Sequence, residues 1–256
     1  MKKTYYYLIG IIIFLLLLKQ QQKKRVLIAL PTIDRDFCFA DKFYKSLQNS
    51  IPKFSNYKFD IVTIMREQDT NMNNFWKDKS IVKKVKNYDI TENRHNLEKV
   101  SEIFNSIKNY ASDQNYDKLI IIESDIMVKY DTISKLLENL SRSDVVVFPF
   151  ETPWTGFPLV INKQNLAVNS RELSGDQYIF GHGTGCVSMN KEIIEDEKIN
   201  FNIETYKNTI GQDVGFFKSL HDNNYKVFMV NDELYHAYKY IERENKKSDI
   251  FNIRMV

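Results

Sequence analysis

The sequence predicts an α/β protein with a mostly parallel central sheet that is flanked by helices. Two features predict this class: short runs of consecutive apolar residues, and segments between them in which apolar residues recur at helical spacing. A strand that is apolar on both faces needs cover on both sides, and parallel sheets obtain that cover from helices. Ligands of such sheets bind beyond the carboxyl ends of the strands, so polar clusters at those ends are the first candidates for a functional site.

The apolar runs are interpreted as buried strands, and the periodic segments as amphipathic helices. The predicted strands cover residues 25–30, 59–65, 119–122, 145–148 and 226–230. The predicted helices cover residues 37–47, 93–111 and 132–140. Asp131 is suited to cap the last of these helices. No internal repeat or linker divides the chain between residues 25 and 256, which predicts one domain over this range.

An uncharged apolar run precedes this domain. It extends from Tyr5 to Leu18 and follows Lys2 and Lys3. A helix of this length reaches about 21 Å, which is short of a hydrocarbon core of about 30 Å, although flanking lysines can extend the span. A cleaved signal peptide is the alternative, but no small-x-small cleavage site follows the run. We therefore expect a tail (1–4), an uncleaved membrane anchor (5–18), a short basic stem (19–24) and the domain (25–256).

The anchor predicts a single-pass membrane protein with the membrane as one partner. Its location would be the Golgi or ER membrane, or the cytosolic face of a host membrane. Basic residues flank the run on both sides and are somewhat more numerous after it, so the orientation stays open.

Charge and cysteine content exclude some classes of function. The net charge is +3 and the 36 Lys and Arg residues are spread along the chain, which argues against nucleic acid as a partner. Cys38 and Cys186 are too few for a disulfide framework and lack the spacing of a zinc site. We expect two buried thiols, with a single bridge as the alternative.

The acidic triplet Glu123-Ser124-Asp125 follows directly on the predicted strand 119–122, at the carboxyl edge of the sheet. Side chains two residues apart on an extended chain point the same way, so both carboxylates can face one ligand. A divalent cation bound with a diphosphate takes one or two carboxylates together with phosphate oxygens. An acidic strand end that simply meets water is the more common explanation of such a triplet alone. Its place after a buried strand favours a site for a metal ion and a diphosphate.

The order of several segments resembles that of the GT-A glycosyltransferases, in particular the family 2 and Anp1-like enzymes. The segments that carry the resemblance are Asn93 to Asn96, 120–125, 132–137 and 211–217, the last of which is similar to a Glu-Asp or Gln-Asp segment that opens a helix. The resemblance implies the GT-A fold and transfer of a sugar from a nucleoside diphosphate donor to an acceptor hydroxyl, with inversion. The chain departs from the family at Glu123, where an Asp is usual, so the geometry of that carboxylate is in doubt.

The resemblance also implies roles for single residues. Asp125 would bind Mn²⁺ or Mg²⁺, and Glu123 would contact the ribose or, through water, the metal. His236 would be a second protein ligand, and an imidazole with a carboxylate suits Mn²⁺ better than Mg²⁺. Asp213 would be the general base that takes the proton of the acceptor hydroxyl. From the local sequence alone, Asp213 is more simply a helix cap and His236 a packed side chain.

Further candidates would surround the nucleotide. Pro31, Thr32 and Arg35 follow the first predicted strand and are expected near the base, with Ser124 at the end of the third. Arg94 could pair with a phosphate through two hydrogen bonds or equally form a salt bridge on a helix surface.

A second group of candidates would face the sugar and the acceptor, which could be a glycan, a glycoprotein or a glycolipid. Gly183 and Thr184 belong to a glycine-bearing segment that resembles the one that approaches donor and acceptor in these enzymes. Glycines also simply make turns. Trp154 could stack on a sugar ring or equally cover the core.

Two other functions stay open. A sugar-1-phosphate nucleotidyltransferase shares the sheet architecture, but those enzymes carry a glycine-rich loop with an arginine after the first strand, and residues 31–36 contain no glycine. A non-catalytic relative that binds carbohydrate or nucleotide is motivated by Glu123. The richness in Lys, Asn, Ile, Tyr and Phe is typical of an AT-rich genome, such as that of a large DNA virus, and does not separate these functions.

Overall fold

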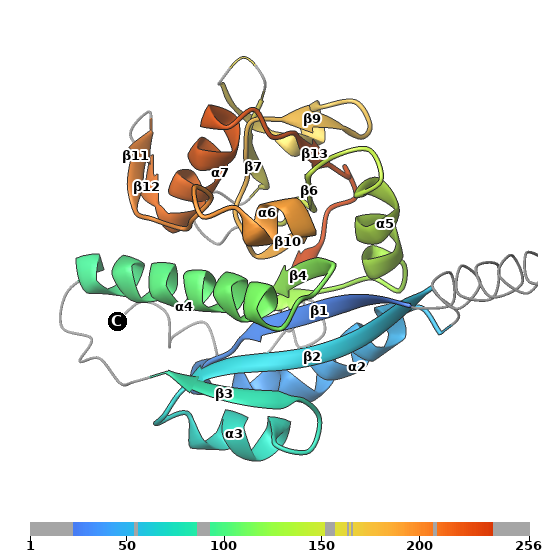
Figure 1. Ribbon diagram of the computed structural model, residues 1–256, viewed down its shortest axis with the longest axis vertical. Coiled ribbons are helices and arrows are strands. Elements are labelled where there is room, and N and C mark those ends of the chain that lie inside the picture. The colour runs from blue at the N-terminus through green and yellow to red at the C-terminus, as the bar shows by residue number, and fades with distance from the viewer. Residues whose placement is uncertain are drawn as a thin grey trace, which may run out of the picture.

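The computed structural model describes residues 23–53, 56–85, 93–151, 157–162, 164, 166–206 and 209–237. Its centre is an eight-stranded sheet in the order β3-β2-β1-β4-β10-β6-β13-β9 (Figure 1). The strands are β1 (Lys24–Pro31), β2 (Tyr57–Arg66), β3 (Ile81–Val85), β4 (Lys118–Ile122), β6 (Val145–Val147), β9 (Gln177–Ile179), β10 (Cys186–Asn190) and β13 (Val227–Met229). Neighbouring strands pair in parallel except at β10 and β9, which run antiparallel to their neighbours. The predicted class, an α/β protein with a mostly parallel sheet, is confirmed.

Helices cover both faces of the sheet (Figure 1). They are α2 (Ala40–Ser50), α3 (Thr70–Trp76), α4 (Asn93–Asp113), α5 (Thr132–Asn139), α6 (Lys191–Glu195) and α7 (Gln212–Asp222), with short 3-10 helices η1 (Asp34–Phe39) and η2 (Ser170–Glu172). Alternate residues of β1 enter two different cores. Val26, Ile28 and Leu30 pack with η1, α2, α3 and α5, whereas Leu27 and Ala29 pack with α4, α6 and α7. This two-sided burial explains why the strand is apolar at consecutive positions.

Three small two-stranded sheets complete the described fold. They are β5 (Ile126–Met127) with β14 (Tyr235–His236), β7 (Leu159–Ile161) with β8 (Ala167–Asn169), and β11 (Glu204–Tyr206) with β12 (Thr209–Gly211). All three are too short to show a pattern in the sequence, and none of them was predicted. The first is important for function because it joins the chain just after β4 to the chain after β13.

The crevice for a ligand follows from the strand order. The chain leaves β1 toward β2 on one side, and β4 lies on the other side of β1, so the order reverses between β1 and β4. In open α/β sheets the ligand crevice lies at such a reversal, beyond the carboxyl ends of the strands. Residues after Pro31 and after Ile122 are therefore the ones placed to contact a ligand.

Several sequence predictions are corrected at the level of single elements. The predicted helix 37–47 is the 3-10 helix η1 followed by α2. Asp131 precedes α5, but its carboxylate pairs with Lys135 at 2.8 Å and does not cap the helix. Cys38 is exposed and Cys186 is buried, and both thiols are free, so the two cysteines neither form a bridge nor lie buried together.

The prediction of a single-pass membrane protein is also corrected. Across the residues that the structure describes, no helix combines the length and the apolar character needed to cross a bilayer. The longest one, α4, is amphipathic and carries Glu98, Lys99 and Glu102 among its side chains. The predicted anchor at 5–18 lies outside the described residues.

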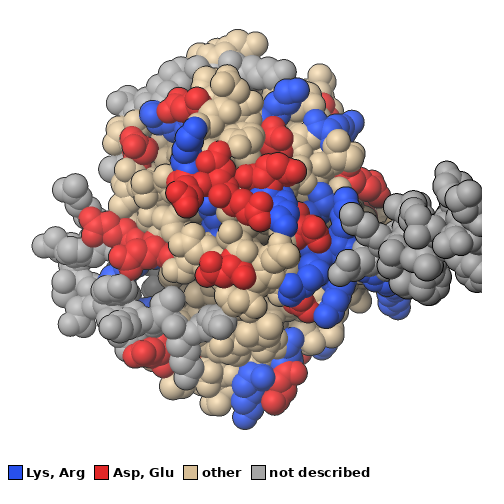
Figure 2. Space-filling model, viewed as in Figure 1, with Lys and Arg blue, Asp and Glu red and all other residues tan. Residues whose placement is uncertain are grey.

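Acidic side chains gather in the middle of the face that carries α4, α6 and α7, with Lys and Arg side chains among and around them (Figure 2). Ion pairs such as Lys218–Asp222 on α7 and Lys191–Glu195 on α6 are part of this mixed surface. Exposed pairs of this kind contribute little stability, so the surface does not by itself identify a partner.

Candidate active site

The acidic turn is held between β1 and the chain before β10. The backbone N–H of Glu123 donates to the carbonyl of Gly185 at 2.9 Å, and that of Ser124 donates to the carbonyl of Pro31 at 3.3 Å. A tight turn follows, in which the N–H of Ile126 donates to the carbonyl of Glu123 at 3.0 Å. These bonds bring the predicted residues Pro31, Glu123 and Ser124 together at the crevice.

Asp125 and His236 form a buried pair. The Nε2 atom of His236 lies 3.1 Å from Oδ2 of Asp125, and both residues are less than a tenth exposed. The backbone explains the approach, because His236 pairs with Ile126 in the β5–β14 ribbon and the N–H of Ala237 donates to the carbonyl of Asp125 at 2.6 Å. The two residues that the sequence suggested as metal ligands are therefore side by side.

Glu123 lies in a concentration of negative charge. Burial raises its pKa to about 8, and the carboxylates of Asp125, Asp213 and Asp36 add to the rise, while Arg35 opposes it. Asp213 comes from the start of α7, distant in sequence, and yet is close enough to act on Glu123. Four carboxylates thus converge on one crevice, an arrangement that a bound cation would stabilise.

Asp213 is the second residue of α7 and does not cap it, since the preceding Gly211 occupies the cap position. Its Oδ1 accepts a hydrogen bond from the backbone N–H of Val214 at 2.9 Å. Burial raises the pKa of Asp213, against the effect of the backbone N–H groups that bond to its carboxylate. The carboxylate is therefore a stronger proton acceptor than an ordinary exposed Asp.

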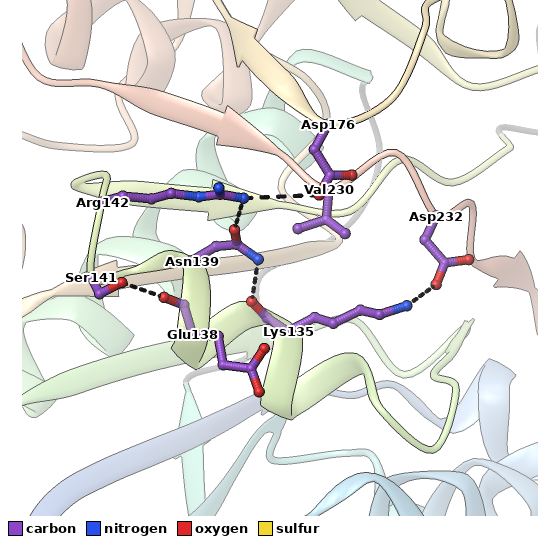
Figure 3. Close-up of a pocket in the computed structure, with 8 residues that line it drawn as sticks. All are labelled: Lys135, Glu138, Asn139, Ser141, Arg142, Asp176, Val230 and Asp232. Carbon is purple, nitrogen blue, oxygen red and sulfur yellow. Dashed lines mark hydrogen bonds and ion pairs between the residues drawn. The ribbon is translucent and has the colours of Figure 1, made fainter.

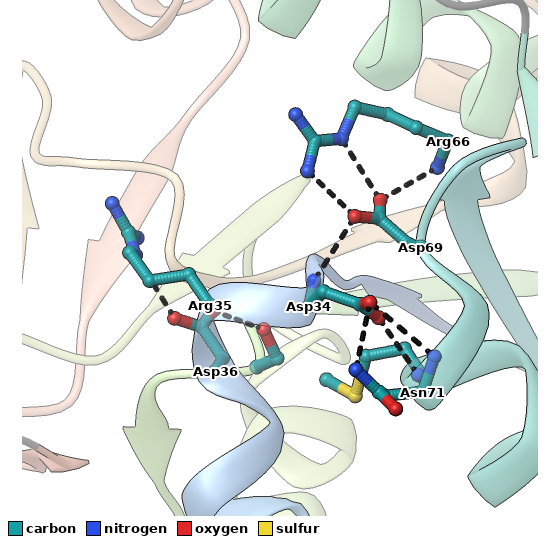
Figure 4. Close-up of polar contacts among 8 residues, drawn as sticks. Asp34, Arg35, Asp36, Arg66, Asp69 and Asn71 are labelled. Carbon is teal, nitrogen blue, oxygen red and sulfur yellow. Dashed lines mark hydrogen bonds and ion pairs between the residues drawn. The ribbon is translucent and has the colours of Figure 1, made fainter.

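The sequence reasoning missed Asp36. This residue lies in η1, is only 3% exposed, and accepts a hydrogen bond from the Ser124 hydroxyl at 2.7 Å through Oδ2. Its Oδ1 accepts a bond from Nε of Arg35 at 3.2 Å, while the rest of the Arg35 side chain is about half exposed (Figure 4). The sequence feature that could have indicated Asp36 is its position as an acidic residue shortly after the first predicted strand. Asp36 ties that loop to the acidic turn.

A second polar cluster fastens the ends of β1 and β2 together. Asp69 is completely buried and accepts two hydrogen bonds from the guanidinium of Arg66, at 2.9 and 2.6 Å (Figure 4). It also accepts one from the N–H of Asp34 at 3.1 Å. Burial alone would raise the pKa of Asp69, but these bonds outweigh it and the pKa is lowered. The side chain of Asp34 in turn accepts from the N–H of Met72 at 2.9 Å, at the start of α3.

The glycine-bearing segment packs against an aromatic ring. A Cβ atom on Gly183 or Gly185 would lie 2.9 or 2.8 Å from Cζ of Phe150, so the absence of side chains lets this ring approach the segment. Thr184 between them is buried, and its hydroxyl has no hydrogen-bond partner among the described residues. The hydroxyl of Thr32, which follows β1, is likewise buried and has no hydrogen-bond partner among the described residues. Both hydroxyls are buried beside the crevice and are not exposed at its surface.

His182 has a structural role. Its Nδ1 lies 2.6 Å from the carbonyl of Leu159, and the N–H of Phe150 donates to its Nε2 at 3.3 Å. Because Nε2 accepts a bond, the proton of the neutral ring is assigned to Nδ1. Burial lowers the pKa of His182 to about 4. A neutral histidine with both nitrogens occupied is neither a base nor a metal ligand here.

Two predicted residues fall outside what the structure describes. Trp154 lies in the segment 152–156, and the side chain of Arg94 belongs to the first turn of α4, of which only the backbone is described. Across the described residues, no three His, Cys, Asp or Glu side chains form a ready-made metal cluster. The pair Asp125–His236 fits a cation that takes its other ligands from phosphate and water.

A separate depression of about 480 Å³ lies beside α5 (Figure 3). Its lining includes Lys135, Arg142, Asp176 and Asp232, and none of the predicted site residues. These four charged groups are already paired, with Lys135 2.6 Å from Asp232 and Arg142 3.9 Å from Asp176. The converging carboxylates are therefore a better candidate for the functional site than this depression is.

Comparison with known proteins gives a family and a fold. The model of the family described as "Guanylyl transferase CofC like" matches residues 54–182. No curated protein matches the chain in sequence. The fragment 1-349 of S. aureus TarS in complex with UDP-GlcNAc is similar in structure, with a TM-score of 0.52 and 14% identity over 82% of this chain and 58% of that fragment. The mannosyltransferase PcManGT from Pyrobaculum calidifontis, in complex with GDP-Man and Mn²⁺, has a TM-score of 0.53 and 11% identity over 84% of this chain and 57% of that protein.

At these identities the likeness shows the fold alone, which is that of the nucleotide-diphospho-sugar transferases. The chain spans less than two thirds of the length of either structure. The family model covers β2 to His182 and includes the acidic turn, but neither Asp213 nor His236.

Proposed function

The chain belongs to the family of CofC-like guanylyl transferases, and from this premise and the geometry of the site we propose that it transfers a glycosyl group from a nucleoside diphosphate sugar to an acceptor hydroxyl. This reaction differs from the guanylyl transfer that the family description names, and the family and the fold have in common with it only a nucleotide-binding transferase. The acceptor would be a glycan, a glycoprotein or a glycolipid.

The observation that carries the proposal is the pair Asp125–His236, with Glu123 and Asp213 beside it. A carboxylate and an imidazole at the switch point of the sheet suit a divalent cation that is bound together with a diphosphate. The second feature of a glycosyl transfer site, a carboxylate that can take a proton, is present in Asp213. Both His236 and Asp213 lie outside the segment that the family model matches.

Asp125 and His236 would hold Mn²⁺ or Mg²⁺, with Glu123 near the ribose or the metal-bound water. A divalent cation, when bound, supplies positive charge that neutralises the departing diphosphate. Thr32, Arg35 and Ser124 surround the crevice where the nucleotide would lie. Asp36 orients Ser124 and Arg35 and so acts on the donor indirectly.

Asp213 would accept the proton of the acceptor hydroxyl while that oxygen bonds to the anomeric carbon. The bond between this carbon and the diphosphate oxygen breaks, and the nucleoside diphosphate leaves with the electron pair. Burial supports this role, because a raised pKa increases the affinity of the carboxylate for the proton. A single displacement of this kind inverts the anomeric centre.

Nucleotidyl transfer is the second candidate, and the family match to guanylyl transferases favours it. In that reaction an acceptor phosphate would attack a nucleoside triphosphate and release pyrophosphate. The loop 31–36 that follows β1 argues against it, because it has no glycine to bring the backbone close to a triphosphate.

The product distinguishes the two reactions. We expect release of nucleoside diphosphate from a panel of UDP- and GDP-sugars with Mn²⁺, and loss of this activity in Asp125→Ala. Release of pyrophosphate from a nucleoside triphosphate and a sugar phosphate, without turnover of any nucleotide sugar, would replace the proposal with the second candidate. Calorimetry with nucleotide and Mn²⁺ tests the non-catalytic alternative, which predicts binding without either product.

A further inference from the structure

Two glycines bracket Asp213, and they perform different tasks. We infer that Gly211 is a positioning residue for Asp213: because it has no Cβ atom, the carboxylate can lie over its backbone. This inference rests on the proposed role of Asp213 as the general base. Gly215, two residues after Asp213, instead fixes the helix on which this carboxylate is carried.

The space above Gly211 is filled by the carboxylate itself. A Cβ atom on Gly211 would lie 2.5 Å from Oδ1 of Asp213 and 3.6 Å from its Cγ, and within the described part of the chain it would meet no other atom within 4 Å. A distance of 2.5 Å is far inside van der Waals contact, so any side chain at 211 must displace the carboxylate. The backbone of Gly211 is extended, with φ 168° and ψ 171°, so an alanine needs no change of backbone conformation.

The same oxygen is held by a backbone hydrogen bond. Oδ1 accepts the hydrogen bond of the Val214 N–H at 2.9 Å, so it is in contact both with this donor and with the space that a Cβ atom on Gly211 would fill. A Cβ atom at 211 would push the oxygen off this position and out of its hydrogen bond. General base catalysis requires the carboxylate within hydrogen-bond reach of the hydroxyl, so a small displacement has a large effect on rate.

The first turns of α7, which carry Asp213, pack closely against the backbone of the preceding segment. A Cβ atom on Gly215 would lie 1.8 Å from the carbonyl oxygen of Asn202, which is backbone and cannot turn away. Next to it, the rings of Phe216 and Phe201 stack at 4.3 Å with an angle of 5° between their planes. The start of α7 is therefore fixed against the chain before β11, and the carboxylate of Asp213 is the part that can move.

Gly211→Ala tests the inference. We expect the variant to fold and to bind nucleotide with Mn²⁺ as the wild type does, with an unchanged KM for the donor. Its kcat should fall by about 10²-fold or more, the size of a lost general base. The acid limb of the kcat–pH profile should also shift from its wild-type position, because the displaced carboxylate changes both its burial and its hydrogen bond from Val214, the two influences on its pKa. Lys218→Ala, which removes only the exposed pair with Asp222 on α7, is the matched control and should keep its kcat.

The test is completed in an Asp213→Ala background, where the obstructing oxygen is absent. Here the added Gly211→Ala change should cost neither activity nor thermal stability, because the two positions are coupled. If Gly211→Ala lowers the melting temperature equally in both backgrounds, Gly211 serves the fold and the inference is wrong. It is also wrong if Asp213→Ala abolishes transfer and Gly211→Ala keeps full kcat. If Asp213→Ala itself keeps transfer, the proposed role of Asp213 fails instead.

Discussion

The imidazole Nε2 of His236 lies 3.1 Å from the carboxylate Oδ2 of Asp125, although every element from β5 to β13 separates the two residues in the chain. The β5–β14 ribbon makes this contact, because it pairs the residue after Asp125 with His236 itself. A site assembled from the middle of the chain and from its last described strand in this way depends on the sheet between them being in place.

Removal of the Asp125 carboxylate is expected to abolish metal-dependent turnover. Asp125→Asn keeps the size of the side chain and removes its charge, so we expect kcat/KM to fall by about 10²-fold or more, as charge stabilisation worth several kcal/mol is lost. The check is turnover of a nucleotide sugar across a Mn²⁺ titration. Asp222→Asn removes an exposed acid of α7 and should behave as the wild type. Equal turnover of the Asp125 variant and this control would contradict the metal assignment.

The bond between Ser124 and Asp36 should contribute to stability and to the shape of the site. Ser124→Ala leaves a buried carboxylate with one donor fewer, which we expect to cost about 1–3 kcal/mol in the free energy of unfolding. Denaturant unfolding measures this cost. Asp36→Asn and the double variant complete a cycle with a coupling energy of at least about 0.5 kcal/mol. A coupling energy of zero would show that the bond is not significant in solution.

The metal-free protein should become less stable as the pH rises. The pKa of Glu123 is raised from 4.5 to about 8, so between these values the folded chain holds a proton that the unfolded chain has released. Stability from this group is therefore complete below about pH 4.5 and is lost as the pH rises to about 8. Thermal unfolding in the presence of a chelator, from pH 5 to 8.5, should show this decline. Glu123→Gln cannot titrate and should flatten the curve over the same range.

His182 is expected to stay neutral in the folded protein down to mildly acidic pH. Its pKa is lowered from 6.5 to about 4, so the unfolded chain binds a proton in this window and the folded chain does not. Its contribution to stability is present above about pH 6.5 and is lost as the pH falls toward 4. NMR of the ring nitrogens should show an Nδ1–H tautomer that does not titrate above pH 5. Titration near pH 6.5 would mean that the bonds to Leu159 and Phe150 are not maintained.

The sequence by itself determined the strands β1, β2, β4, β6 and β13 and the acidic turn, whereas β3, β9 and β10 of the same sheet were not predicted. Consecutive apolar residues in β1, β4 and β6 call for burial on both faces, which indicates a mostly parallel sheet covered by helices; the antiparallel placement of β10 between β4 and β6 came only from the structure. The position of Glu123 and Asp125 at the carboxyl edge of the sheet could also be predicted, because they come directly after the buried strand β4. Asp213 and His236 could be suggested from the sequence, but their distance from the turn could not.

Only the tertiary structure decided which distant residues meet at that turn. The pairing of β14 with β5 brings His236 to Asp125, and the conformation of η1 brings Asp36 to Ser124; both depend on two-residue strands and short loops that have no periodic signal. The role of Gly211 is a matter of a single missing Cβ atom beside Asp213. Local sequence determines which residues reach the crevice, whereas the close contacts between them are set by the packing of the complete chain.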